Sequence, residues 1–157
     1  MNPLLEGMLL SLLPVAELRG GIPYAVALGI NPIAAFIFCT LANILVTPIC
    51  FLFLETLNKL LLKMRWYKKF FDFYIKSIRK RKAKVEKLYE TYGMIALTIF
   101  VAIPLPLTGA WTGSLIAWLL GLKKSRSFLA ISLGVIIAGI IVTLIVTGIL
   151  AVLSFLL

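Results

Sequence analysis

Histidine is absent from the sequence, and cysteine and acidic residues are scarce. The 157 residues include two cysteines and six acidic residues, against 16 lysines and arginines. Without imidazole, the commonest general base and a principal metal ligand are both missing. Cys39 and Cys50 are too far apart in sequence for a CxxC motif, so packing is their expected role. The sequence therefore predicts no enzyme, no metal site and no cofactor.

Charge is also absent from three long stretches of the chain. Residues 20–54, 91–122 and 127–157 contain no Asp, Glu, Lys or Arg. The chain is 62% hydrophobic and has a mean hydropathy of +1.08. A membrane-spanning helix needs about 20 apolar residues, so each stretch is long enough to cross a bilayer. These properties predict a multi-pass α-helical protein of the cell membrane.

Positive charge is concentrated in the middle of the sequence. Residues 59–90 carry 12 Lys or Arg against three acidic residues, which gives +9 of the total net charge of +10. Residues 123–126 hold a second basic cluster. Because cytoplasmic loops of membrane proteins are enriched in Lys and Arg, both segments are expected in the cytoplasm. Both termini are then expected outside.

The basic middle segment also carries apolar residues at helical spacing. This pattern predicts an amphipathic helix that docks on anionic lipid headgroups. The alternative is a solvated linker helix that only sets the topology. Nucleic acid is not an expected partner, because no sequence motif for nucleic-acid recognition accompanies the basic residues. The stripe consists of Met64, Tyr67, Phe71, Tyr74, Ile78, Val85 and Leu88.

Two of the apolar stretches are interrupted by residues that weaken helices. Residues 14–23 read PVAELRGGIP, and residues 103–113 read IPLPLTGAWTG. Proline and glycine both disfavour a continuous helix. Non-helical backbone at membrane depth survives only where protein or a water-filled cavity surrounds it. Both segments are therefore predicted to be tips of re-entrant hairpins, and the first is followed by a full span at about residues 31–55.

The predicted elements repeat with opposite orientation in the membrane. Aligning the two halves places Pro14 on Pro106 and Gly21 on Gly113, a weak match in so biased a composition. The predicted fold is an all-α polytopic membrane protein with two inverted repeats, a design of secondary transporters. Its single membrane domain comprises a first hairpin and span (1–58), a cytoplasmic linker (59–90) and a second hairpin and span (91–157).

The candidate site consists of polar and conformationally special residues at the two tips. Glu17 and Arg19 are expected either to contact a substrate or coupling ion, or to neutralise each other in an unwound tip. Asn43 and Thr47, one turn apart on the first span, either line the cavity or hydrogen-bond between helices. The other candidates for substrate or ion binding are Gly20, Gly21, Pro23, Pro104, Pro106, Thr108, Gly109, Trp111, Thr112 and Gly113.

Several strings resemble one known family. These are ELRGGIPYAVALG at residues 17–29, the basic middle, and YGMIA followed by IPLPLTG within residues 92–109. Together they look like the small multidrug export family, which is related to the DedA and VTT-domain membrane proteins. The resemblance implies opposed re-entrant hairpins that move lipid-like or amphipathic molecules across the bilayer. Members of the wider superfamily are lipid scramblases or flippases of carrier-lipid phosphates, and some of these proteins are linked to proton or sodium gradients.

One departure from the DedA pattern bears on how a substrate phosphate could be bound. DedA proteins carry arginines on either side of the proline in the second hairpin, and Val101 and Leu107 occupy the matching positions here. A phosphate held between two arginines is therefore not expected, and Arg19 is the sole basic residue predicted within the membrane.

We therefore expect a transporter, lipid scramblase or flippase with a midplane site at the hairpin tips. Its substrate would be a lipid, a carrier-lipid phosphate or a small drug, and Glu17 would link flux to a proton or sodium gradient. The alternative is a non-transporting membrane organiser, whose basic middle binds lipids or partners. A homodimer is also expected, because two hairpins and two spans give a thin wall around any cavity.

Overall fold

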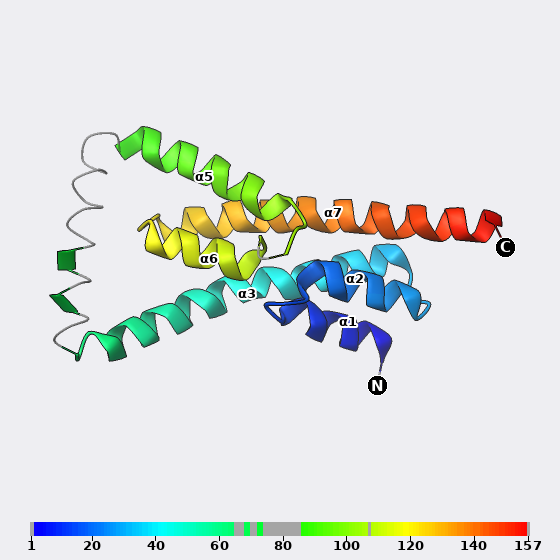
Figure 1. Ribbon diagram of the computed structural model, residues 1–157, viewed down its shortest axis with the longest axis horizontal. Coiled ribbons are helices and arrows are strands. Elements are labelled where there is room, and N and C mark those ends of the chain that lie inside the picture. Colours follow the sequence, from blue (N-terminus) through cyan, green and yellow to red (C-terminus); the bar gives the residue numbers. More distant parts are fainter. Residues whose placement is uncertain (1, 65–67, 70–71, 74–85, 107, 157) are drawn as a thin grey trace.

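All elements of regular secondary structure in the described part of the chain are helices (Figure 1), which confirms the predicted all-α class. The computed structural model describes every residue except 1, 65–67, 70–71, 74–85, 107 and 157. The predicted amphipathic helix of the basic middle lies largely outside the described residues. The helices are α1 (Pro3–Leu12), α2 (Glu17–Ala27), α3 (Pro32–Leu61), α5 (Glu86–Ala102), α6 (Ala110–Leu119) and α7 (Lys124–Leu156).

Asparagine caps followed by proline start two of the helices in the first half. The Asn2 side chain accepts a hydrogen bond from Leu4 N at 3.0 Å, and the Asn31 side chain accepts one from Ile33 N at 2.8 Å. Proline follows each cap, where its missing N–H is not needed and its fixed φ suits the first turn. The sequence thus determines where α1 and α3 begin.

Helices α3 and α7 are the two described helices that are long and apolar enough to cross a membrane. Their most apolar windows have mean hydropathies of 2.3 and 2.9. The first span was predicted to end near Glu55, but α3 continues to Leu61. At about 1.5 Å per residue, the 30 residues of α3 are longer than the roughly 30 Å hydrocarbon core requires.

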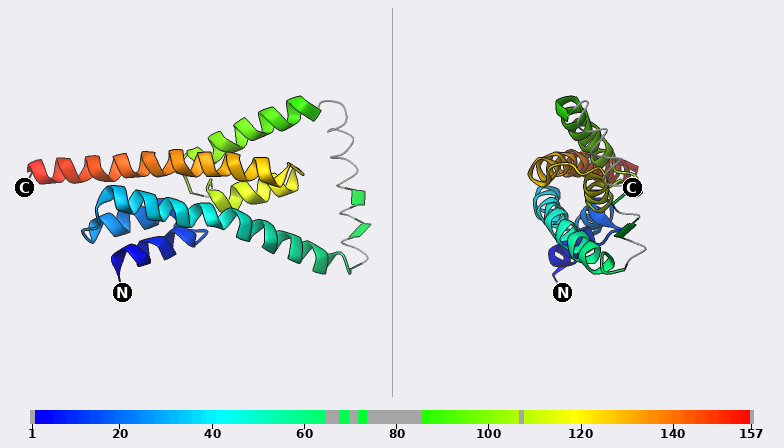
Figure 2. Two further views of the ribbon diagram at one scale, coloured as in Figure 1. Left: turned by 180° about the vertical axis from the view of Figure 1, so that it is seen from behind. Right: turned by 90° about the vertical axis from the view of Figure 1, so that its left-hand side faces the viewer.

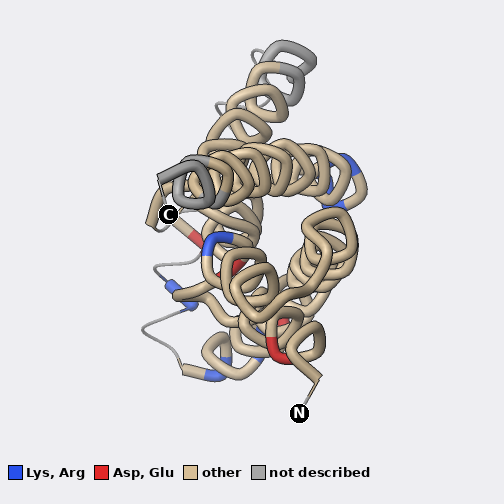
Figure 3. Tube along the Cα trace, turned by 90° about the vertical axis from the view of Figure 1, so that its right-hand side faces the viewer, with Lys and Arg blue, Asp and Glu red and all other residues tan. Residues whose placement is uncertain are grey.

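The two halves of the chain have the same order of elements and run in opposite directions. Each half has two shorter helices followed by one long helix, α1–α2–α3 and then α5–α6–α7. Figures 1 and 2 show α3 and α7 antiparallel along the long axis. The pairs α1–α2 and α5–α6 each run from one end toward the middle of the molecule and turn back, and they do so from opposite ends. The end of α3 and the starts of α5 and α7 lie at the same end of the molecule, with the start of α7 between the other two (Figure 1). A view along the long axis shows how few charged positions the helices carry (Figure 3).

The break between α1 and α2 is shorter than predicted. Only residues 13–16, here called the first turn, are non-helical, and Glu17–Ala27 forms α2. The prediction of an unwound tip over residues 14–23 was therefore wrong from Glu17 onward. A helix satisfies backbone groups that lipid leaves unpaired, which explains why the chain stays helical through Gly20, Gly21 and Pro23.

The break between α5 and α6 comprises the described residues 103–106 and 108–109, here called the second turn. The Thr108 hydroxyl lies 2.5 Å from Ile103 O and 2.9 Å from Leu105 O, and it accepts from Leu105 N at 3.1 Å. One side chain thus pairs several backbone groups that a helix would otherwise pair. The predicted tip continued to Gly113, but α6 already begins at Ala110.

Candidate functional site

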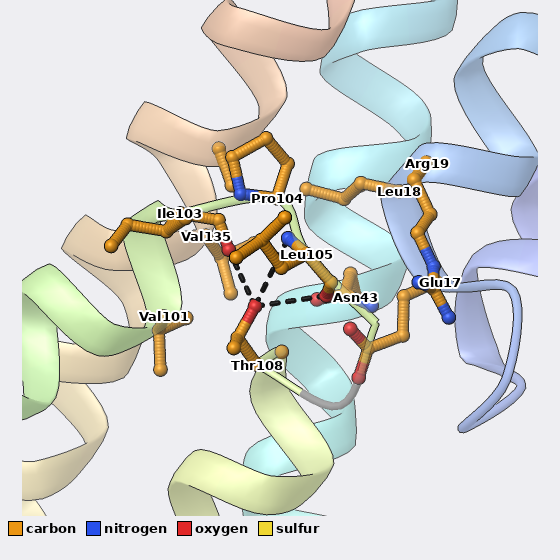
Figure 4. A pocket seen from close by; sticks show the side chains of 12 residues that line it. Glu17, Leu18, Arg19, Asn43, Val101, Ile103, Pro104, Leu105, Thr108 and Val135 are labelled. Atoms are coloured by element: carbon orange, nitrogen blue, oxygen red, sulfur yellow. Dashed lines mark hydrogen bonds between the residues drawn. The ribbon is translucent and has the colours of Figure 1, made fainter.

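The start of α2, directly after the first turn, meets the second turn in the middle of the molecule, and a small pocket lies between them (Figure 4). The pocket has a volume of about 20 Å³, roughly the space of one water molecule. Its walls come from both halves of the chain, including the apolar side chains of Leu18, Val101 and Val135. Its polar lining consists of Glu17, Arg19, Asn43 and Thr108.

Glu17 is the first residue of α2, and its carboxylate reaches the second half of the molecule. Its backbone has φ of +46°, the one positive φ among described non-glycine residues. Oε1 accepts from Trp111 N at 3.5 Å. Gly109, the N-cap residue of α6, has no side chain to make such a bond, and a Cβ there would overlap the Glu17 carboxylate. The carboxylate therefore lies where unpaired N–H groups and the helix dipole favour negative charge.

Arg19 does not form the structural ion pair considered from the sequence. Its guanidinium donates to the carbonyl oxygen of Val15, and within the described residues no ion pair joins it to Glu17. Because α2 begins at Glu17, the two side chains leave a helix at positions i and i+2, which do not face each other. Both nevertheless line the pocket (Figure 4), so two ionisable groups of opposite charge lie beside it and attract each other without forming an ion-pair contact.

Asn43 fulfils both roles considered for it. It lines the pocket, and its Nδ2 donates to Ser11 O at 2.6 Å, which joins α3 to α1. Its side chain is 1% exposed. Thr47, one turn further along α3, is also buried but does not line the pocket, and its Oγ1 has no partner among the described residues. Only one of these two predicted residues reaches the pocket.

Trp111 closes the end of α1 from the other half of the chain. Its Nε1 donates to Leu12 O at 3.0 Å, and Asn43 pairs the neighbouring Ser11 carbonyl. The last carbonyls of a helix have no partner within it, so these two bonds pair the Ser11 and Leu12 carbonyls at the end of α1. The main-chain oxygen of Trp111 also accepts from Cys50 Sγ at 3.8 Å. A single residue of α6 therefore contacts α1, α2 and α3.

The predicted glycines have separate structural roles. A Cβ at Gly21 would overlap the Ser11 side chain and the Gly7 carbonyl, and one at Gly113 would lie 2.6 Å from Val101 Cγ2. These glycines permit close packing within the α1–α2 and α5–α6 pairs, whereas Gly109 permits the approach of the two turns. Gly20 has only the Ala16 side chain nearby, at 2.8 Å.

The other predicted residues divide into those that reach the pocket and those that do not. Pro104, Thr108 and Gly109 line it, but Pro23, Pro106 and Thr112 do not. Thr112 instead lines a separate surface groove of about 240 Å³. The sequence reasoning missed the Ser11 and Leu12 carbonyls and the apolar wall. Main-chain oxygens carry no residue signal, and Val135 and Ala138 resemble every other apolar residue of α7.

These observations define the class of protein. The described helices include two of membrane-spanning length, and polar groups gather in one pocket where the halves meet. These features are typical of a membrane protein.

The sequence matches the family described as "Putative small multi-drug export protein" over residues 17–141, and the chain belongs to this family. The matched segment begins at Glu17 and includes every residue that lines the pocket. No curated protein and no solved structure matches the chain. The family description names export rather than catalysis, which is consistent with a membrane transporter.

Proposed function

We propose that the protein is a membrane transporter whose substrate passes between the first and second turns. The observation that carries the proposal is the placement of Glu17 and Arg19. An ionisable side chain at bilayer depth costs about 2.5–3.5 kcal/mol on insertion scales, yet two of them line one pocket in the middle of an apolar molecule. Such residues mark substrate or ion pathways in membrane proteins.

The proposed topology follows from the helix lengths and the basic clusters. At about 1.5 Å per residue, the 10 or 11 residues of α1, α2 and α6 cover only about half of the hydrocarbon core. These helices would therefore re-enter the bilayer from opposite sides, while α3 and α7 cross it. The end that carries residues 59–61 and 123–126 would face the cytoplasm, and both termini would lie outside.

The proposed cycle includes an opening step, because the described pocket is small. A volume of about 20 Å³ holds roughly one water molecule, not a lipid or a drug. The two turns must separate before an amphipathic substrate reaches Glu17 and Arg19. Separation would break the Glu17–Trp111 and Leu12–Trp111 hydrogen bonds. Inverted repeats that move against each other around a central site supply such a step in transporters.

The substrate class is an amphipathic molecule: a lipid, a carrier-lipid phosphate or a small drug. We propose scrambling or flipping as the mode, a relationship to DedA and VTT-domain proteins, coupling to protons or sodium, and a homodimeric assembly. No catalytic step is proposed, because the Thr108 hydroxyl in the described pocket hydrogen-bonds to main-chain oxygens rather than to Glu17. The basic middle would add an attachment to anionic headgroups.

A headgroup-resolved flux assay tests this function. Purified protein in liposomes should accelerate the movement of labelled phosphatidylglycerol, phosphatidylcholine or a hydrophobic cationic dye above protein-free liposomes. If the substrate is anionic, Arg19→Gln should lower its flux about tenfold, because a charge-assisted hydrogen bond contributes roughly 1.5–3 kcal/mol. Lys59→Gln, which removes a cation outside the pocket, is the matched control. Failure of the wild-type protein to accelerate any of the three would favour the non-transporting organiser.

A further inference from the structure

A second, larger recess lies on the outer surface between α3 and α7. This α3–α7 groove has a volume of about 570 Å³, within the range of small-molecule sites. Its apolar walls include Phe51, Leu52 and Leu129, and the last two are 66% and 61% exposed. Pro48, at the opposite end of the groove's α3 wall from Glu55, precedes Glu55 by roughly two helical turns. None of its lining residues belongs to the pocket between the turns.

One end of the α3–α7 groove is charged. Lys124 and Glu55 both line it and form an ion pair there. Their side chains are 55% and 36% exposed, and ion pairs with this exposure contribute little net stability. Lys123 and Arg126 flank Lys124 in the same basic segment of the sequence, residues 123–126, which contains no acidic residue. An anion that displaced Glu55 from Lys124 would therefore enter a positive environment.

We propose that the α3–α7 groove binds an anionic phospholipid of the leaflet beside this basic end. One acyl chain lies along Phe51, Leu52 and Leu129, and the headgroup phosphate accepts hydrogen bonds from Lys124 in place of Glu55. Basic pockets between membrane-spanning helices are sites for anionic headgroups. This inference requires only that α3 and α7 lie in a bilayer, so it does not depend on transport through the pocket between the turns.

The charge distribution favours a lipid over a second copy of the chain. In a two-fold symmetric dimer, the same patch of both copies meets at the interface. A dimer formed through the α3–α7 groove would place the basic segments of both copies near one another, and like charges at an interface are unfavourable. A phospholipid presents the complementary combination of an apolar chain and a negative headgroup.

The test is native mass spectrometry of the full-length protein in detergent, titrated with phosphatidylglycerol or phosphatidylcholine of identical acyl chains. The wild-type protein should bind phosphatidylglycerol more tightly. Lys124→Gln should weaken that binding about fivefold, which corresponds to the roughly 1 kcal/mol expected for one basic group near a headgroup. Glu55→Gln should strengthen it, because the internal competitor is removed. Lys59→Gln, which removes a nearby cation that does not line the groove, should change it little.

A second pair of variants tests the acyl-chain part of the site. Leu129→Trp should fill the groove and weaken binding of both lipids, whereas Leu144→Trp, at a similarly exposed position of α7 (65%), should not. Thermal unfolding and gel filtration establish that each variant is folded, and Leu52→Ala provides a milder change in the same wall. Equal binding of the two lipids by the wild-type protein would overturn the proposal. Equal losses of phosphatidylglycerol binding in Lys124→Gln and Lys59→Gln would also overturn it. Unchanged lipid binding by folded Leu129→Trp and Leu52→Ala proteins would overturn it as well.

Discussion

The Glu17 carboxylate caps the N-terminus of α6 from the other half of the chain, with Oε1 3.5 Å from Trp111 N. An N-cap residue normally supplies this acceptor itself, but Gly109 has no side chain. The helix dipole adds to the attraction, typically by about 0.3–1 kcal/mol for an exposed site. One carboxylate thus joins the start of α2 to the start of α6, and its charge affects how firmly these two helix ends are held together.

Substituting Glu17→Gln should therefore abolish gradient-driven transport and leave the protein folded. The amide keeps the shape of the side chain but cannot ionise, so it loses its charge interaction with α6 and cannot exchange a proton. The measurement is flux into liposomes across a pH series, together with thermal unfolding. The matched control is Glu6→Gln, which changes an acid outside the pocket that accepts a hydrogen bond from Tyr24. Full-rate transport by Glu17→Gln at every pH would remove Glu17 from the coupling mechanism.

Gly109→Ala should interfere with the approach of the two turns, because its methyl group would occupy the position of the Glu17 carboxylate. Backbone strain is not the reason, since φ at Gly109 is −96° and suits any residue. Overpacking of this kind typically costs about 1–3 kcal/mol, measured as a loss of unfolding free energy. A double-mutant cycle identifies the cause. The cost should fall in a Glu17→Ala background, and an unchanged cost would mean that the two residues do not meet.

Asn43→Leu should destabilise the protein by about 1–3 kcal/mol, because it leaves the Ser11 carbonyl at the end of α1 buried and unpaired. Thr47→Val is the comparison on the same helix. The Thr47 hydroxyl is buried without a partner among the described residues, so its removal should be neutral or stabilising. Thermal unfolding in one detergent gives both values. Equal destabilisation by the two substitutions would contradict the assigned role of Asn43.

Much of the fold was predictable because the positions of apolar, charged and helix-breaking residues largely determine where a membrane protein forms helices and where it turns. Long uncharged stretches indicated the helices, and two breaker segments indicated where the chain turns. The error at α2 has a physical cause. Gly21 and Pro23 weaken a helix in water, but backbone without a partner is costlier in lipid, and the close packing of Gly21 on Ser11 helps to keep α2 helical.

The site was predictable in part for a related reason. Glu17, Arg19 and Asn43 are conspicuous because they are polar in apolar surroundings, and all three line the pocket. The partners that position them are less visible in a sequence. The Glu17 carboxylate meets a main-chain N–H of Trp111, and Asn43 meets a main-chain oxygen of Ser11. Such partners follow from the arrangement of α1, α3 and α6 in space, which residue types alone do not specify.

Gly21→Ala should impair folding, and therefore yield, more than it impairs transport per folded molecule. The added methyl would overlap the Gly7 carbonyl, a backbone atom that moves only if α1 and α2 separate. We expect a loss of about 1–3 kcal/mol in unfolding free energy. Gly148→Ala provides the control, since a Cβ there meets nothing within 4 Å and alanine favours a helix. Normal stability of Gly21→Ala would show that the α1–α2 contact is looser than described.

The final prediction concerns orientation in the membrane. Asn31 is the N-cap residue of α3 and Lys124 is the first residue of α7, and these antiparallel helices start at opposite ends of the molecule (Figure 1). In a variant with Cys39 and Cys50 replaced by alanine, a single cysteine at Asn31 should react with a membrane-impermeant maleimide added outside intact cells. A single cysteine at Lys124 should react only after the membrane is opened, because the basic cluster beside it favours the cytoplasm. Both positions are exposed in the fold, so protection of either reports the membrane rather than burial. Labelling of both from the same side would contradict opposed insertion of α3 and α7, and with it the proposed re-entry of the two helix pairs from opposite faces.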